Sequence, residues 1–102
     1  DTLTEARRVD VLNELSYQYF MLDNAKSEAY ARQALTLSQL TKNPWAEIRA
    51  RRNLGNALGS RYRSREALIQ VNKALDIALA ISDRASQAKC LHAIGLIYLF
   101  RE

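Results

Sequence analysis

Cys90 and His92 are the two side chains of this sequence whose chemistry would suit nucleophilic catalysis. A nucleophilic cysteine needs a basic partner within hydrogen-bonding distance. Residues two apart on a helix point about 200° away from each other, so these two cannot form a dyad within one chain. Neither lies in a metal-binding motif or a phosphate-binding loop. We therefore expect Cys90 to be a small buried hydrophobe, and the protein to be no enzyme, with no catalytic residue, metal site or cofactor.

A basic segment between Trp45 and Glu66 is the second feature that could do chemistry. It holds six arginines and two glutamates, whereas the rest of the chain has nine bases and nine acids, so the whole net charge of +4 arises here. Guanidinium groups bind carboxylates through paired hydrogen bonds, which favours an acidic partner. The alternatives are solvated arginines, or arginines paired with Glu47 and Glu66. Nucleic acid is not the expected partner, because the segment has no nucleic-acid motif and the charge excess is modest. The arginines are Arg49, Arg51, Arg52, Arg61, Arg63 and Arg65.

The elements that position these residues are predicted to be helices, since no segment alternates with a period of two. One helix is predicted from Pro44 to about Arg61, with Asn43 as its N-cap and the proline at its first position. Ser64 is the predicted N-cap of the next helix, which runs to about Ile81. Its apolar residues recur at i, i+4, i+7, i+8 and i+11, a single stripe. They are Ala67, Val71, Ala74, Leu75 and Ala78.

The sequence repeats at an interval of about 40 residues, a period typical of stacked helix pairs. At an offset of 40, Leu54-Gly55 falls on Ile94-Gly95, and Ala74-Leu75 falls on Ala34-Leu35. The start of the chain fits better at 39, where Leu15-Ser16 falls on Leu54-Gly55. We predict one all-α domain of five helices in antiparallel pairs, with repeat 1 at about 4–42, repeat 2 at about 43–82 and a half repeat at 83–102.

Small and large residues recur in the second unit at Leu54-Gly55, Leu58, Ala67, Val71 and Ala74-Leu75. This spacing resembles the tetratricopeptide repeat, and the first and third units keep part of it. The interval of about 40 residues exceeds the commoner ~34 and is similar to the long form in bacterial regulators and sensor proteins. The resemblance implies a right-handed α-superhelix that serves as a protein-interaction scaffold. It also implies a regulatory or sensory module of a larger signalling protein.

The resemblance further implies a concave groove, lined by the first helix of each pair, that binds a peptide or partner protein. Arg52 and Asn56 lie one helical turn apart on one face, where family members that hold a peptide C-terminus carry Lys and Asn. Arg replaces Lys here, and Ala93 stands where Asn or Arg is expected. That clamp is therefore incomplete, and we expect a polar, basic groove for an acidic or C-terminal peptide. The groove residues so assigned are Asn13, Tyr17, Arg49, Arg52, Asn53, Asn56, Lys89, His92 and Leu96.

The segment after Ser82-Asp83 predicts one further helix, which is apolar nearly all round. In a longer array the next helix would cover part of it, and a terminal repeat needs a polar outer face. Two hypotheses follow. Either the chain is a fragment of a longer protein, or this helix pairs with a second copy in a homodimer. Structural self-association is thus the alternative function, and we assign it to Leu96, Leu99 and Phe100.

The compartment is indicated only by features that the sequence lacks. Apolar runs fall well short of the ~20 residues that span a bilayer, and the first residues do not resemble a signal peptide. The single cysteine allows no internal disulfide, which favours a reducing compartment. We expect a cytoplasmic location, with a periplasmic or extracytoplasmic sensor region as the alternative.

Overall fold

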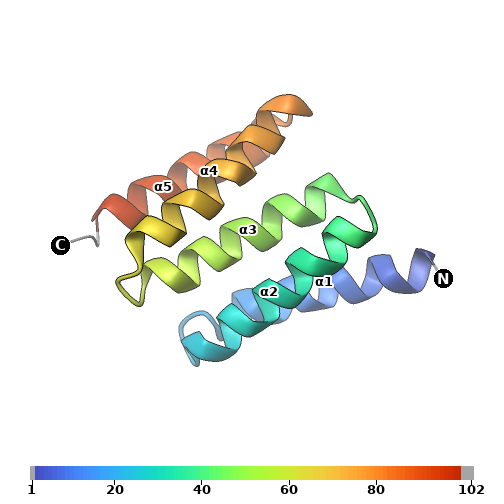
Figure 1. Cartoon of the computed structure of the whole chain (residues 1–102), viewed down its shortest axis with the longest axis horizontal. Helices are drawn as coiled ribbons and strands as arrows, with labels where there is room; N and C mark the ends of the chain where they lie inside the picture. Colours follow the sequence, from blue (N-terminus) through green and yellow to red (C-terminus); the bar gives the residue numbers. More distant parts are fainter. Residues whose placement is uncertain (1, 100–102) are drawn as a thin grey trace.

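The computed structural model describes residues 2–99, and within that range the chain is built of helices with no strand (Figure 1). The prediction of an all-α fold with five helices, each packed against its neighbours, is confirmed. The helices are α1 (Thr2–Tyr19), α2 (Asn24–Leu40), α3 (Pro44–Gly59), α4 (Ser64–Ala80) and α5 (Arg84–Leu99).

Helix starts are evenly spaced from α2 onward, because the capping positions before them are evenly spaced. The side chain of Asp23 accepts a hydrogen bond from the Lys26 amide, and that of Asn43 accepts one from Ala46. Such bonds satisfy amides that lack a partner in the first turn. The equivalent position before α4 is Arg63, which makes no side-chain cap bond. The prediction of Ser64 as N-cap was therefore wrong by one residue, since Ser64 is the first residue of the helix.

Three of the turns share one backbone geometry and follow the same even spacing. Lys42, Tyr62 and Ser82 have φ values of 52°, 61° and 57°. After each, the next amide bonds a carbonyl near the end of the preceding helix, as Asp83 N does with Ala78 O at 3.0 Å. This left-handed turn ends a helix and satisfies carbonyls that have no partner in the last turn. It is why α3 stops at Gly59 rather than near Arg61.

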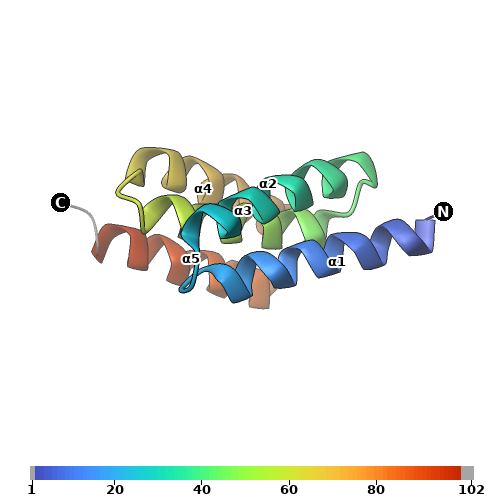
Figure 2. The ribbon, with the colours of Figure 1, turned by 90° about the horizontal axis from the view of Figure 1, so that it is seen from below.

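The helices form two layers. α1, α3 and α5 make one row, and α2 and α4 pack on the same side of that row (Figure 2). Each helix contacts the next one in sequence, and α3 also contacts both α1 and α5. Of the α4 stripe predicted from spacing, Ala67, Val71, Ala74 and Ala78 are buried, and Leu75 is partly buried. On α2 the equivalent stripe is also buried and consists of Ser27, Ala31, Ala34 and Ser38.

Small residues let the two helices of each pair approach closely. A Cβ added to Gly55 of α3 would clash with Val71 Cγ2 of α4 and lie 3.2 Å from the Ala67 carbonyl oxygen. In the first pair, Ser16 and Ser27 stand at the same place. The Ser16 hydroxyl donates to Ser27 O at 2.8 Å, and the Ser27 hydroxyl donates to Ser16 O at 2.7 Å. Larger side chains at either crossing would force the helices apart.

Candidate functional site

One stripe of α3 faces away from α2 and α4. Its residues recur at i, i+4, i+7 and i+11, the spacing of one helical face, and are Trp45, Arg49, Arg52 and Asn56. Because α3 lies between α1 and α5, residues of all three helices border this stripe. We call this side of the molecule the first-helix surface. Of the residues predicted from sequence, it also presents Tyr17 of α1 and Lys89, His92 and Leu96 of α5, all exposed.

Arg52 is the most unusual cation of this surface. Its side chain is half-buried, and its Nε has no hydrogen-bond partner among the described residues. Burial lowers the pKa of the Arg52 guanidinium, and the like charge of Arg49 lowers it further, whereas Cys90 and Tyr17 act in the opposite direction. Arginine keeps its proton in proteins, so Arg52 is a partly dehydrated charged group with no acidic partner among residues 2–99. Such a group is stabilised by any carboxylate that reaches it.

Arg49 lies beside Arg52 and is only loosely paired. Its Nη2 is 3.7 Å from Glu14 Oε2 of α1, and both side chains are substantially exposed. An exposed pair at this separation contributes little to stability, so Arg49 remains available to a second anion. The charge of the first-helix surface is asymmetric, because its α1 side carries the acidic Glu14 and its α5 side carries the basic Lys89.

Two predicted groove residues are corrected by the structure. Asn13 and Asn53 are 0% and 4% exposed, so neither is presented to a ligand. Asn53 Nδ2 donates to Asn13 O at 3.1 Å, and Asn13 Nδ2 donates to Ala46 O at 3.2 Å. These bonds tie α1 to α3 in the interior, where polar groups need partners. Their role in this fold is to join the two helices.

The six arginines of the basic segment lie in four different places in the molecule. Arg51 is buried between α3 and α4, where it pairs with Glu47 at 2.9 Å and donates to Gln70 at 2.7 Å. Arg61 and Arg63 lie at the α3–α4 turn and pair with Glu28 of α2. Arg63 also pairs with Glu66, as the alternative interpretation of the sequence held. Arg65 is exposed on α4. Only Arg49 and Arg52 of the six arginines therefore lie on the first-helix surface.

On α5, Cys90 is fully buried and His92 is exposed. The expectation that Cys90 is a small buried residue is confirmed. Burial raises the pKa of its thiol, with Arg52 acting in the opposite direction, so the reactive thiolate is disfavoured. Leu99 is exposed near the end of the helix, and Phe100 lies outside the described residues.

Trp45 was not among the predicted groove residues, yet it is exposed one turn before Arg49 on the same stripe. The signal was available, because an aromatic residue four positions before Arg49 must share its face. An aromatic side chain beside two guanidinium groups adds apolar contact area to the charged contacts. Such a surface suits an extended peptide better than guanidinium groups alone would.

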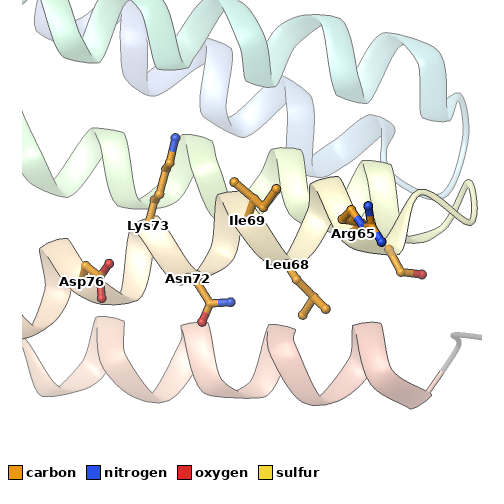
Figure 3. Close-up of a pocket in the computed structure, with 7 residues that line it drawn as sticks. Arg65, Leu68, Ile69, Asn72, Lys73 and Asp76 are labelled. Atoms are coloured by element: carbon orange, nitrogen blue, oxygen red, sulfur yellow. The ribbon is translucent and has the colours of Figure 1, made fainter.

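A hollow of about 550 Å³ lies elsewhere, over the exposed face of α4 (Figure 3). All of its lining residues belong to this one helix, so no second element closes it, and ligand pockets are normally concave and enclosed. We place the candidate site on the first-helix surface because the desolvated Arg52 lies there. The hollow is lined by Ser64, Arg65, Leu68, Ile69, Asn72, Lys73 and Asp76.

Within residues 2–99 no group of three or more His, Cys, Asp or Glu side chains could hold a metal ion. Of the described helices, none has the length and apolar character needed to cross a bilayer. A scan against protein-family models and a search of curated proteins each found no match to this chain.

Proposed function

We propose that this chain is a tetratricopeptide-like interaction module that binds a carboxylate-bearing peptide on its first-helix surface. The observation that carries the proposal is Arg52, a half-buried guanidinium whose Nε has no partner among the described residues. Support for the repeat assignment comes from the helix pairs, which recur with the period of the sequence and have small residues at their crossings. In this proposal the module is the regulatory or sensory part of a larger signalling protein.

The ligand carboxylate is placed between Arg49 and Arg52. A carboxylate there would accept hydrogen bonds from two guanidinium groups and relieve their mutual repulsion. Asn56, one turn further along the same stripe, offers an amide that can bond the ligand backbone. Trp45 at the other end of the stripe offers apolar contact. The four residues together span about three helical turns, enough for several residues of extended peptide.

The charge asymmetry of the surface sets the direction of the acidic group. Glu14 repels a carboxylate on the α1 side, whereas Lys89 attracts it on the α5 side. We therefore expect the acidic end of the ligand to lie toward α5. Buried Asn13 and Asn53 take no part in binding, although their bonds hold α1 in place beside α3.

The test uses fluorescein-labelled peptides of one sequence that end in Asp-Asp or Asn-Asn, each with a free or an amidated C-terminus. Anisotropy titrations should show tighter binding for peptides with more carboxylates. The four peptides also separate a side-chain carboxylate from a terminal one. Arg52→Gln should weaken binding by about 10- to 100-fold, the range for loss of charged hydrogen bonds.

The matched control is Arg65→Gln, which removes the same charge from an exposed arginine on α4. It should leave affinity within about twofold of the original. Equal losses from both variants would mean that net charge alone attracts the peptides. The proposal fails if no peptide binds, or if Arg52→Gln binds as tightly as the unaltered chain while circular dichroism shows both to be folded.

A further inference from the structure

One helix-packing site recurs on α1, α3 and α5, and among the described residues the next helix covers it on α1 and α3 but not on α5. Gly95 of α5 corresponds to Gly55 of α3, one repeat earlier in the chain. Gly55 is buried, and a Cβ there would clash with Val71 of α4. At Gly95 a Cβ would meet no described atom within 4 Å. The two glycines thus differ in whether a helix lies against them.

The residues around the two glycines show the same contrast. Leu91 is 58% exposed, whereas its counterpart Arg51 on α3 is 9% exposed. Tyr98 is 56% exposed, whereas its counterpart Leu58 is 1% exposed. We call the residues that share this side of α5 the open face. They are Ala88, Leu91, Gly95, Tyr98 and Leu99, none of which carries a charge.

The open face is separate from the first-helix surface. On α5, Lys89, His92 and Leu96 lie on the side that continues the α3 stripe, since they stand one repeat after Arg49, Arg52 and Asn56. The open face instead continues the side of α3 that α4 covers. Among the described helices, α5 also stands at the end of the row, in contact with α3 and α4 but not with α1 (Figure 2). A ligand of either surface would therefore leave the other accessible.

The helices that cover the two equivalent sites define what fits. α2 on α1 and α4 on α3 both bury small or β-branched residues at i, i+4, i+7 and i+11. The first of these residues, Ser27 or Ala67, meets the small residue of the partner, Ser16 or Gly55. Close approach at that point brings the longer side chains on either side into contact. A helix with bulky residues in those positions could not approach Gly95.

We propose that the open face binds an amphipathic helix of α4-like chemistry, with small residues at i, i+4, i+7 and i+11 and the first of them against Gly95. Leu91 and Leu99 would be buried on either side of this contact. An exposed apolar face of this kind marks an interaction site, and the register follows from the α1–α2 and α3–α4 pairs.

The first probe is a labelled synthetic peptide with the sequence of residues 64–80, added to the 102-residue chain. It should bind with a gain of helicity by circular dichroism. Gly95→Ala should weaken that binding about tenfold or more, because the added methyl occupies the crossing. Leu96→Ala is the matched control on the same helix, and it should change the affinity by less than about twofold.

A second readout tests the same idea without a separate ligand. In the 102-residue chain without an added helix, Gly95→Ala should raise the folding equilibrium constant about fivefold. Alanine is the better helix former, and its methyl group meets open space. In a chain extended after Glu102 by a copy of residues 63–80, which keeps the register of the repeat, the same substitution should lower this equilibrium constant. A reversal of sign is the expected result, and it cannot arise from helix propensity alone.

Three outcomes would overturn the proposal. Peptide binding that Gly95→Ala leaves unchanged would show that the contact lies elsewhere. A stabilising effect of Gly95→Ala in the extended chain would show that the added helix does not pack at Gly95. A dimer of the unextended chain in light scattering that Gly95→Ala dissociates would identify a second copy of α5, rather than an α4-like helix, as the occupant.

Discussion

Asn53→Ala is expected to destabilise the fold rather than to remove a ligand contact. The Asn53 side chain is almost fully buried, and its Nδ2 donates to the Asn13 carbonyl oxygen at 3.1 Å and lies 3.4 Å from Asn13 Oδ1. The substitution removes this donor and leaves buried acceptors of Asn13 without it. An unsatisfied buried polar group costs about 1–3 kcal/mol, and the lost bond contributes about 1 kcal/mol.

Part of that loss is offset, because alanine exceeds asparagine in helix propensity by up to ~0.7 kcal/mol. We therefore expect the free energy of unfolding to fall by about 2 kcal/mol. For a domain of this size that corresponds to a Tm lower by about 10 °C. Urea and thermal unfolding followed by circular dichroism in the far ultraviolet would measure both quantities.

Asn56→Ala provides the matched control, since it is the same substitution one turn later on the same helix, at a half-buried position of the first-helix surface. It carries the same propensity gain, so the difference between the two variants isolates the Asn13–Asn53 contact. We expect that difference to be about 2–3 kcal/mol. A difference below about 0.5 kcal/mol would refute the assignment of a structural role to Asn53. So would weakened binding of the Asp-Asp peptide by folded Asn53→Ala, with unchanged binding by Asn56→Ala.

Three further predictions concern the crossings and turns. Gly55→Ala should lower the free energy of unfolding by about 1 kcal/mol, because overpacking against the fully buried, β-branched Val71 outweighs the propensity gain; a stabilised variant in urea denaturation would contradict this. Ser82→Gly should raise it by about 0.5–1 kcal/mol, since glycine adopts the φ of 57° without the steric cost of a Cβ, and an unchanged urea midpoint would contradict that reasoning. Hydrogen bonds from the amide and then the hydroxyl of Ser86 lower the pKa of Asp83 in the folded state. The ionised Asp83 cap therefore stabilises the fold at pH values above the unfolded pKa of about 3.9, and this stabilisation is lost as the pH falls through the lower folded pKa. Unfolding curves from about pH 7 to pH 3 should therefore show a larger acid loss for the original chain than for Asp83→Asn, and parallel losses would exclude this role.

Much of the fold could be predicted because the signals for helices are local. The i, i+4, i+7, i+11 stripe of α4 and the capping pair Asn43-Pro44 lie within single segments, and both are present in the structure. The left-handed backbone of Tyr62 was not predicted, because a left-handed residue that is not glycine has no strong signature. The N-cap position of Arg63 was missed for a related reason, since arginine rarely occupies an N-cap and Arg63 makes no capping bond there.

The candidate site could be predicted only in part. Helical spacing placed Arg52 and Asn56 on one face and would have added Trp45, whereas the family resemblance supplied Arg49. The family resemblance also assigned Asn53 to the groove, although its side chain lies about 100° around the helix from that of Arg52. Whether the Asn53 side chain faces solvent or another helix depends on where α1 packs. In the structure α1 covers it.

By itself the sequence determined the helices, their regular recurrence and the angular position of each side chain about its own helix axis. Only the tertiary structure decided which of those angles are covered. Gly55 and Gly95 are the same residue at equivalent positions of two repeats, yet α4 lies against the first and no described residue lies within 4 Å of a Cβ on the second. The reason is physical: periodicity is a property of one helix, whereas burial requires a second helix to supply the opposing surface.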